Sequence, residues 1–290
     1  MSKLALGTAQ FGLTYGVANQ KGKIEFSDVN KILKLAKNSN IDLIDTAISY
    51  GDSEKVIGDL GIKDFKFVSK LPPLPKDCSD VNSWVDKQVQ SSLTRLGISS
   101  LYGLLVHRSE NLLGNSGKKL INALNSIKLN GLVKKIGISI YDPSEYEQVM
   151  KFTRIDIVQA PLNIVDRRLV VSGLLTKLHS EEIEIHTRSA FLQGLLLIPS
   201  NKIPKSFNKW FKVWEKWSLE LKKNNLSAAE VCLLYPLSLP EIDRVIVGVD
   251  NVNQLNEIIK ISKSQQSKID WSFMISNDQM LINPTNWHKS

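Results

Sequence analysis

The chain has 290 residues, of which 42% are hydrophobic and 23% are charged, so it has enough apolar side chains to bury a large core. Its two cysteines, Cys78 and Cys232, are far apart and form no Cys-x-x-Cys spacing, which argues against a disulfide framework and a structural zinc site. The formal net charge of +8 does not predict a nucleic-acid partner, because the lysines are scattered and form no basic run with interleaved aromatic residues. We expect a solvated basic surface, with steering of an anionic cofactor or substrate as the alternative.

Two features of the sequence bear on where the protein works. The first residues lack the long apolar stretch of a signal peptide, and no window approaches 18 uninterrupted apolar residues. We therefore expect a cytoplasmic protein without a membrane-spanning helix, which agrees with the small number of cysteines. The sequence makes no prediction of the oligomeric state.

Short runs rich in Val, Ile and Leu recur along the chain with room for a helix between them. Several of these runs are apolar on both faces, which is typical of strands buried in a parallel sheet. The eight candidate strands span residues 4–7, 43–45, 66–70, 103–107, 135–139, 156–159, 183–187 and 244–248.

Helical patterns with start signals lie between these strands. Ser27 precedes apolar residues at positions 29, 32, 33 and 36. Ser79, Asp142 and Ser227 precede patterns that end near residues 96, 150 and 237. Ser or Asp before a helix can accept hydrogen bonds from its first free N–H groups, and Pro143 suits the first helical position.

The alternation of strands and helices predicts an α/β fold with a parallel sheet, and eight units favour its closed form, the (β/α)8 TIM barrel. A doubly wound open sheet is the alternative. The length matches one such barrel, so we predict a single domain over residues 1–290. Two irregular stretches interrupt the pattern, at residues 195–205 and in a C-terminal tail from about residue 265.

Aromatic residues concentrate in two places. Those of the C-terminal tail could cap the barrel mouth or anchor the tail to the surface. A second set shares one face of a predicted helix, where a packing stripe is favoured over a binding platform. The two sets are Trp271, Phe273 and Trp287, and Trp210, Trp214 and Trp217.

Three further residues carry weaker signals. His186 lies in an apolar strand and Cys232 in an apolar helix, so we expect both in the core. Arg188 follows the seventh candidate strand, where it could meet a cofactor phosphate or a substrate anion.

Polar residues at the carboxyl ends of the strands are the candidates for catalysis, because the loops that follow the strands build the active site of a barrel. Asp45, Lys70 and His107 close the second, third and fourth candidate strands, and Tyr50 lies on the loop after the second. Each alone could simply mark where the chain meets water. Together they would point into one mouth, where a buried lysine and aspartate need each other as partners. A lysine beside Tyr50 would lower the pKa of the phenol, which suits a general acid or base.

The segments that carry these residues resemble the aldo-keto reductases, and the matches follow the family's order from residue 4 to about residue 260. The matching segments are LGTAQFG (6–12), IDTAISYG (44–51) with SE (53–54), VSK (68–70), LLVH (104–107), GIS (137–139), VQAPLN (158–163), SAFLQGL (189–195), IVG (246–248) and QLNE (254–257). Three segments resemble a bacterial branch of the family that is associated with surface-polysaccharide pathways, namely SIYDP (139–143), IVDRR (164–168) and HTRSAFLQG (186–194).

The resemblance implies a nicotinamide-dependent carbonyl reductase that needs no metal ion. Tyr50 would donate a proton to the carbonyl oxygen as hydride from the nicotinamide reaches the carbonyl carbon. Lys70 would lower the pKa of Tyr50, Asp45 would hold Lys70 by an ion pair, and His107 would orient the carbonyl. Hydrogen bonds from Tyr50 and His107 would stabilise the negative charge that develops on the oxygen.

The resemblance also implies where the cofactor binds. The fifth and sixth strands would hold the nicotinamide carboxamide, and the loop after the seventh would run along the pyrophosphate. The segment after the eighth would surround the adenosine end, where a helix N-terminus can receive phosphate. No Gly-x-Gly-x-x-Gly follows the first strand, so a Rossmann site is not supported. The implied cofactor-binding residues are Gly7, Thr8, Ser139, Gln159, Ser189, Phe191, Gln193, Gly194, Gly248, Asp250, Gln254 and Glu257.

The sequence departs from the family pattern at two places. Ile140 stands where the family often has Asn, which removes one carboxamide contact. Asp250 and Gln254 stand where members specific for NADPH usually have Lys or Arg to meet the 2′-phosphate, and an aspartate can instead accept from a 2′-hydroxyl. The usual preference of the family favours NADPH as the cofactor, with NADH as the alternative. A lysine from another part of the chain could take the place of the missing contact to the 2′-phosphate.

The resulting hypothesis is an enzyme that reduces a small aldehyde or ketone. The resemblance to the bacterial branch suggests a sugar-derived carbonyl compound as the substrate. The alternative is a barrel that binds the cofactor as a sensor or regulatory subunit with little turnover. The intact set of four residues favours the enzyme, because a pure binder does not need an activated tyrosine. A metal-dependent hydrolase is disfavoured by the four histidines and the absence of ligand-like spacing.

Overall fold

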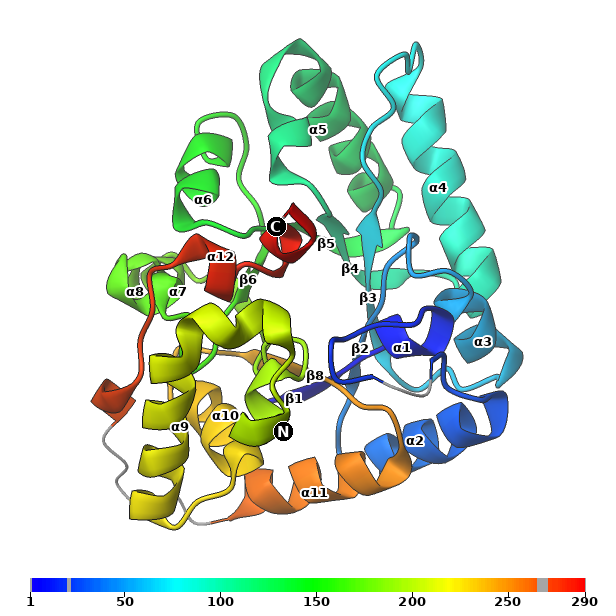
Figure 1. Ribbon diagram of the computed structural model, residues 1–290. Helices are drawn as coiled ribbons and strands as arrows, with labels where there is room; N and C mark the ends of the chain where they lie inside the picture. Colours follow the sequence, from blue (N-terminus) through cyan, green and yellow to red (C-terminus); the bar gives the residue numbers. More distant parts are fainter. Residues whose placement is uncertain (1, 20–21, 265–270, 290) are drawn as a thin grey trace.

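Eight parallel strands close into a barrel in the order in which they occur along the chain (Figure 1). The computed structural model describes residues 2–19, 22–264 and 271–289. The barrel closes between its first and last strands, with Leu4 opposite Val245 and Gly7 opposite Gly248. The open-sheet alternative is therefore wrong and the (β/α)8 barrel is confirmed. The strands are β1 (Leu4–Gly7), β2 (Leu43–Asp45), β3 (Lys66–Leu71), β4 (Leu101–Val106), β5 (Val133–Ser139), β6 (Ile157–Pro161), β7 (Glu184–Arg188) and β8 (Arg244–Gly248).

The predicted strand bounds agree with the structure to within one or two residues. Two differences affect the mouth of the barrel. His107 lies one residue beyond β4, although its backbone N–H still donates to the Leu71 carbonyl at 3.2 Å. Arg188 is the last residue of β7, in register with Pro161 of β6.

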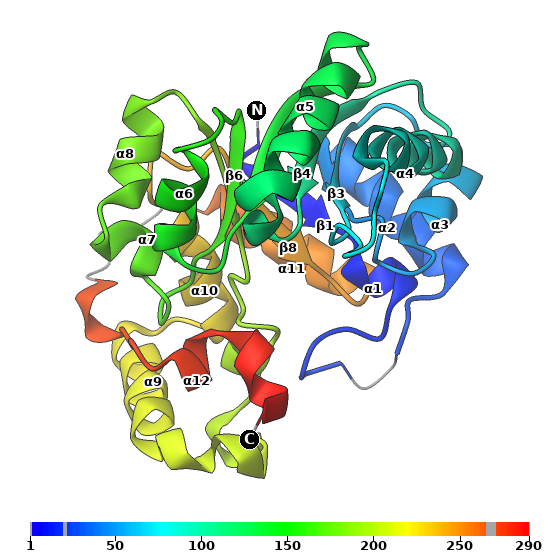
Figure 2. The same cartoon turned by 90° about the horizontal axis from the view of Figure 1, so that it is seen from above.

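Helices surround the strands on the outside of the barrel (Figures 1 and 2). The longer helices are α2 (Phe26–Asn38), α3 (Ser53–Asp59), α4 (Val81–Leu96), α5 (Gly114–Leu129), α6 (Pro143–Val149), α8 (Leu174–Ser180), α9 (Phe211–Asn224), α10 (Ala228–Leu237) and α11 (Val252–Lys263). Single turns are α1 (Ala9–Gly12), α7 (Arg168–Val171) and α12 (Gln279–Ile282), and short 3-10 helices are η1 (Ser109–Leu112), η2 (Leu195–Leu197), η3 (Ser200–Lys202), η4 (Lys205–Trp210), η5 (Trp271–Phe273) and η6 (Pro284–Lys289). The stretch predicted as irregular, 195–205, thus consists largely of short 3-10 turns.

Two of the four predicted helix starts are as expected. Asp142 and Ser227 each accept a hydrogen bond from the first turn of α6 and α10, and a glutamate three residues on completes a capping box. The cap of α4 is Asp80 rather than Ser79. The start of α2 is also wrong, because this helix begins at Phe26 and Ser27 lies within its first turn.

The strands place the functional residues in one layer. The barrel interior holds a small apolar cluster made by Ala5, Leu43, Val68, Leu105, Ile157 and Ile246. Because side chains alternate along a strand, the residue two positions later faces the same interior, nearer to the carboxyl end. On the two remaining strands, Ser139 and Arg188 follow Gly137 and His186 in the same way. The layer comprises Gly7, Asp45, Lys70, His107, Ser139, Gln159, Arg188 and Gly248.

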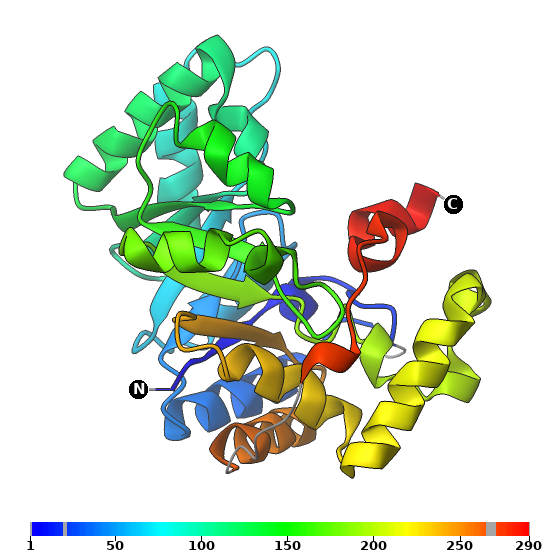
Figure 3. The ribbon, with the colours of Figure 1, turned by 90° about the vertical axis from the view of Figure 1, so that its left-hand side faces the viewer.

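The C-terminal segment lies at the mouth of the barrel, at the end opposite to the N-terminus (Figure 3). The Ser276 N–H donates to the Val165 carbonyl at 2.9 Å, and the Trp287 ring packs edge-on against Phe207 at 4.9 Å. The tail therefore joins the loop after β6 to η4. In the part of the chain that the structure describes, none of the helices has the length and apolar character needed to cross a membrane.

Candidate active site

Asp45 and Lys70 form a buried ion pair at the mouth of the barrel. Lys70 Nζ lies 2.6 Å from Asp45 Oδ2 and donates a second hydrogen bond of 2.9 Å to the Thr46 carbonyl. The Lys70 side chain is 1% exposed and that of Asp45 is 5% exposed. Burial lowers the pKa of Lys70, and the Asp45 charge opposes this shift. The second oxygen of Asp45 accepts from Gln159 Nε2 at 2.7 Å, so each polar group of the pair has a partner.

Tyr50 lies against this pair, with Lys70 Nζ 5.1 Å from the centre of its ring. The expected lowering of its pKa is not found. Burial raises the pKa of Tyr50 above its ordinary value, the Asp45 charge adds to the rise, and Arg188 opposes it. The charge of Lys70 is already committed to Asp45, so Tyr50 holds its proton at neutral pH.

Two glycines fix the turn that presents Tyr50. A Cβ atom on Gly12 would lie 1.9 Å from the Tyr50 carbonyl oxygen and 2.5 Å from the Ser53 nitrogen. Gly51 has a φ of 53°, and a Cβ there would lie 2.5 Å from the Gly12 oxygen. The turn after β2 and α1 therefore pack backbone against backbone, which larger residues would prevent.

A buried carboxylate anchors the helix that follows this turn. Glu54 of α3 is 1% exposed and accepts hydrogen bonds of 2.6 Å from both Ser69 of β3 and Ser92 of α4. Its other oxygen accepts two hydrogen bonds from Arg95, at 2.9 and 2.6 Å. The SE pair of the family motif thus fixes α3, and with it the Tyr50 turn, to β3 and α4.

His107 faces Tyr50 across the mouth, with the two ring centres 6.1 Å apart and the rings edge to face. Its Nδ1 lies 3.4 Å from the Ser49 hydroxyl. Burial, with the nearby charges of Lys70, Arg188 and Arg108, lowers the pKa of His107 to about 3. The imidazole is therefore neutral at physiological pH, and one of its nitrogens can donate a hydrogen bond to an oxygen in the mouth.

A cavity of about 530 Å³ opens beside these residues at the carboxyl ends of β1, β6, β7 and β8. This volume is typical of a site for a small molecule or cofactor. Asp45 and Tyr50 line the cavity, and so do all of the predicted cofactor residues except Ser139. The Thr8 hydroxyl is already engaged, since it donates to the Asp45 carbonyl at 3.1 Å and accepts from Ser53 at 2.9 Å.

The amide group of Gln159 shows that a nicotinamide fits here. Its Nε2 donates to Asp45, while its Oε1 is buried and has no hydrogen-bond partner among the residues that the structure describes. A buried acceptor without a donor costs free energy that a bound donor recovers. A carboxamide N–H is such a donor, so the residues present fit the nicotinamide group.

The loop after β7 crosses the cavity in a tightly wound conformation. Ser189, Leu192 and Gln193 have positive φ angles of 64°, 48° and 54°, which non-glycine residues rarely adopt. The Asn163 amide holds the Ser189 carbonyl at 3.1 Å, and the Gln193 carbonyl accepts from Val17 N at 3.0 Å. Strain of this kind is concentrated at ligand sites, and here it lines the predicted pyrophosphate path.

The start of α11 closes the far end of the cavity. Asn251 caps the helix, and Asp250, Gln254 and Glu257 line the cavity. The Gln254 amide oxygen accepts a hydrogen bond from Asp250 N at 2.7 Å. This predicted cofactor-binding residue therefore also stabilises the start of the helix. Both carboxylates face the end of the cavity that the adenosine would reach.

A smaller cavity of about 190 Å³ is lined by His107. Ser139 lines this cavity rather than the larger one, together with Tyr141. Asn283 and Thr285 of the tail form its outer wall. The tail therefore does both things that its aromatic residues suggested, because it is anchored by Trp287 and also covers part of the mouth.

Sequence reasoning missed several residues of the two cavities. Tyr15 and Asn19 of the loop after β1 line the larger cavity, and Tyr141 lines the smaller one. Ala228 and Ala229, at the start of α10, also line the larger cavity. Only the position of these residues, after β1, after β5 and at the start of α10, could have indicated them, since none belongs to a residue type that stands out.

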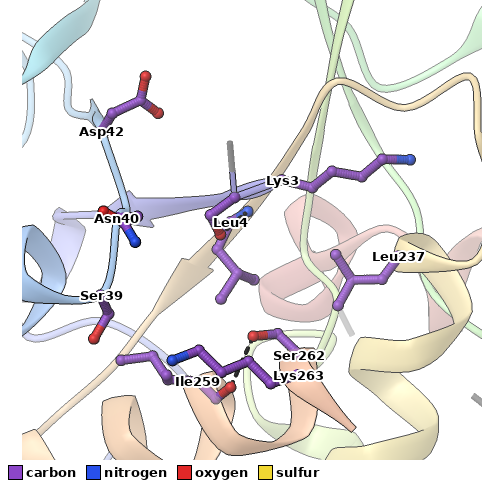
Figure 4. Close-up of a pocket in the computed structure, with 10 residues that line it drawn as sticks. Lys3, Leu4, Ser39, Asn40, Asp42, Leu237, Ile259, Ser262 and Lys263 are labelled. Carbon is purple, nitrogen blue, oxygen red and sulfur yellow. Dashed lines mark hydrogen bonds between the residues drawn. The ribbon is translucent and has the colours of Figure 1, made fainter. Parts of the chain in front are cut away.

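Another hollow, of about 690 Å³, lies at the opposite end of the barrel (Figure 4). Two of its charged groups, Lys3 and Asp42, already have partners. Lys3 Nζ donates to the Leu239 carbonyl at 2.9 Å, and Asp42 pairs with Lys66 at 2.9 Å and with Arg244 at 2.8 Å. These contacts close the base of the barrel, where polar residues act on stability rather than on catalysis.

The remaining predicted residues lie in the core. Cys232 is fully buried in α10, and His186 is buried with Nε2 2.8 Å from Glu184 Oε1. Trp214 and Trp217 are buried too, and their indole N–H groups donate to the Phe207 and Leu196 carbonyls. Trp210 is half-buried and donates to Asp278 at 2.7 Å. The aromatic stripe of α9 is therefore packing.

The chain is similar in sequence to two bacterial proteins over most of its length. It is 24% identical over 289 residues to an uncharacterised oxidoreductase of Bacillus subtilis, covering 92% of each chain. It is 23% identical over 316 residues to the NADH-specific methylglyoxal reductase of Escherichia coli, covering 94% of each.

Solved structures of other proteins share the fold of this chain. A holo aldo-keto reductase of Bacillus halodurans superposes with a TM-score of 0.71 at 16% identity, covering 91% of this chain and 88% of that one. The glycerol dehydrogenase of Gluconobacter oxydans superposes with a TM-score of 0.69 at 18% identity, covering 92% and 88%. The model of the aldo/keto reductase family matches residues 3–274. With this match over nearly the whole barrel, the chain belongs to the aldo/keto reductase family of NAD(P)H-dependent oxidoreductases.

Proposed function

We propose that the protein reduces a small aldehyde or ketone to the alcohol, with Tyr50 as the proton donor. The buried Asp45–Lys70 ion pair next to Tyr50 supports this most strongly. The charged atoms of the pair, Lys70 Nζ and Asp45 Oδ2, lie 2.6 Å apart. A buried ion pair is a costly way to stabilise a fold. Here it places one positive charge next to the phenol that must lose a proton.

The chemistry divides between the cofactor and the chain. Gln159 would hold the nicotinamide group, which would supply the hydride when bound. Tyr50 supplies the proton, which its raised pKa keeps on the phenol until the carbonyl oxygen becomes basic. A C–H bond and an O–H bond would form at the carbonyl group while the C–H bond of the reduced nicotinamide, the carbonyl π bond and the Tyr50 O–H bond break. Solvent would then return a proton to the phenolate.

The other three residues act on charge and position. Lys70 stabilises the phenolate that Tyr50 leaves behind, and Asp45 keeps the ammonium group from moving away. His107 is neutral, so it can donate a hydrogen bond to the carbonyl oxygen without protonating it. Donors fixed in a dry site stabilise the developing oxyanion more than they stabilise the ground state.

For the cofactor, the family preference predicts NADPH, whereas the cavity favours NADH. Asp250 and Glu257 line its far end, and no lysine or arginine lines that end among the residues that the structure describes. A carboxylate repels a 2′-phosphate and can accept from a 2′-hydroxyl. A relative at 23% identity is an NADH-specific methylglyoxal reductase, which agrees with NADH and a small carbonyl substrate.

The test follows the oxidation of NADH with a panel of aldehydes, ketones and sugar-derived carbonyls. We expect turnover by the wild type and a loss of roughly 100- to 10,000-fold in kcat for Tyr50→Phe, with NADH affinity retained. Tyr102→Phe, at the base of the barrel, is the matched control. Equal rates for wild type and Tyr50→Phe would refute the mechanism. NADH binding without reduction of any panel member would instead favour the sensor function.

A further inference from the structure

Arg188 is a half-buried cation at the reaction end of the larger cavity. One of its Nη atoms donates to the Ile140 carbonyl at 3.0 Å, and the other lies 3.5 Å from the Ser189 hydroxyl. Across residues 2–19, 22–264 and 271–289, no carboxylate forms an ion pair with it. A guanidinium removed from water without a counter-ion is costly, so this position favours the binding of an anion.

The Arg188 side chain lines the larger cavity and also contacts a residue of the smaller one. The Arg188 guanidinium carbon lies 4.3 Å from the centre of the Tyr141 ring, on the loop after β5. The guanidinium carbon of Arg108 lies 6.0 Å from the centre of the same ring. Arg108 and Tyr141 line the smaller cavity together with His107. The Tyr141 ring thus brings two cations close to the residue that would orient the carbonyl.

Two acidic residues, Glu110 and Glu145, line the smaller cavity, and neither forms an ion pair with Arg108 or Arg188 among the residues that the structure describes. Glu145 lines the smaller cavity, but one of its oxygens accepts from the backbone nitrogens of Tyr141 and Asp142, at 2.9 and 2.8 Å. The other oxygen accepts a hydrogen bond from Ser109. Its carboxylate is therefore committed to the capping of α6, and the positive charge of Arg188 and Arg108 faces the mouth.

The cofactor phosphates are the other anions that could meet Arg188. They would lie along the loop after β7 and at the start of α11, where Asp250 marks the far end of the cavity. Arg188 reaches the opposite way, across β6 to the Ile140 carbonyl. Its direction therefore favours a substrate anion over the pyrophosphate.

We propose that Arg188, assisted by Arg108, binds a carboxylate of the substrate, which makes the preferred substrate a carbonyl compound with a nearby carboxylate, such as a 2-oxo acid. This inference rests on the proposed carbonyl reduction. The planar fork of an arginine binds a carboxylate with two hydrogen bonds and fixes its orientation. A carboxylate held there leaves the adjacent carbonyl in the mouth shared by Tyr50 and His107.

The test compares pairs of substrates that differ only in charge, a 2-oxo acid and its methyl ester, with NADH as the reductant. For the wild type we expect kcat/KM to favour the acid by at least about tenfold. Arg188→Gln should lose roughly 10- to 100-fold in kcat/KM for the acid and change little for the ester. Arg188→Lys should recover part of the preference. Arg154→Gln, which removes an exposed arginine outside both cavities, controls for net charge.

A binding measurement keeps this test independent of turnover. Oxamate is an unreactive analogue of a 2-oxo acid, and oxamide is its neutral control. Calorimetric titration of the NADH-loaded protein should show oxamate binding that Arg188→Gln abolishes, and no oxamide binding. Equal kcat/KM for acid and ester, or oxamate binding unchanged in Arg188→Gln, would overturn the carboxylate site while leaving carbonyl reduction intact. A loss of NADH affinity in Arg188→Gln that accounts for the whole effect would also overturn it, because Arg188 would then bind the cofactor.

Discussion

Gln159 of β6 donates a hydrogen bond of 2.7 Å to Asp45 of β2, across the inside of the barrel, and leaves its own amide oxygen without a partner. The same side chain therefore orients the ion pair and presents an acceptor to the cavity. This arrangement connects the proton-donating residues with the predicted nicotinamide position through one amide group.

Replacement of Gln159 should weaken cofactor binding. In Gln159→Met the acceptor for the carboxamide disappears and Asp45 loses one donor, so we expect the Kd for NADH to rise roughly tenfold. Titration of the tryptophan fluorescence with NADH measures this change. Gln90→Met, on the exposed side of α4, should bind NADH like the wild type. An unchanged Kd for Gln159→Met would exclude Gln159 from the nicotinamide site.

Removal of one member of the buried ion pair should destabilise the fold strongly. Asp45→Asn or Lys70→Met alone leaves an uncompensated buried charge, so we expect each to lower the free energy of unfolding by about 3–5 kcal/mol. The double variant leaves no charge behind and should recover most of this loss, yet remain inactive. Urea denaturation of the wild type, the two single variants and the double variant gives the four free energies of a double-mutant cycle. Additive losses in the double variant would show that the pair is not coupled.

The pH dependence should reveal a neutral histidine. Because the pKa of His107 is held at about 3, its protonation does not limit the reduction of the carbonyl near pH 6.5. The unfolded state binds this proton below about pH 6.5 and the folded state does not, so His107 lowers the stability as the pH falls from 6.5 toward 3. Wild type should lose more stability than His107→Gln between about pH 7 and pH 4. Identical losses would mean that His107 titrates normally.

The cofactor preference should depend on Asp250. Asp250→Ser removes the charge that repels a 2′-phosphate, so we expect kcat/KM for NADPH to rise roughly tenfold while that for NADH falls. Parallel assays with the two cofactors measure the ratio. Asp86→Ser, on the surface of α4, serves as the control for net charge. A wild type that already prefers NADPH strongly would contradict the role assigned to Asp250.

The barrel was predictable because its signals are local. Buried parallel strands are apolar on both faces, so short apolar runs such as residues 43–45 and 244–248 can be recognised in the sequence as strands. Asp45 and Lys70 stood out for the same reason, since a charge at the end of an apolar run needs a partner. Helix starts were less certain, because Ser79 and Asp80 are equally good caps and only the backbone decides between them.

The electrostatics and the substrate side of the site were not predictable in the same way. The raised pKa of Tyr50 results from burial by residues on several strands, whereas the sequence indicated only its proximity to Lys70. The stacking of Arg188 on Tyr141 depends on the path of the loop after β5. Ser139 was expected to face the cofactor but lines the smaller cavity together with His107.

The smaller cavity and the ion pair are formed by different parts of the chain. The outer wall of the smaller cavity comes from Asn283 and Thr285, after the last strand and helix of the barrel, whereas the ion pair and its neighbours come from β2, β3 and β6. A single recombination event after α11 would exchange this wall between related proteins without touching the interior layer. Chimeras joined at that point offer a direct route to new substrate ranges on an unaltered reaction centre.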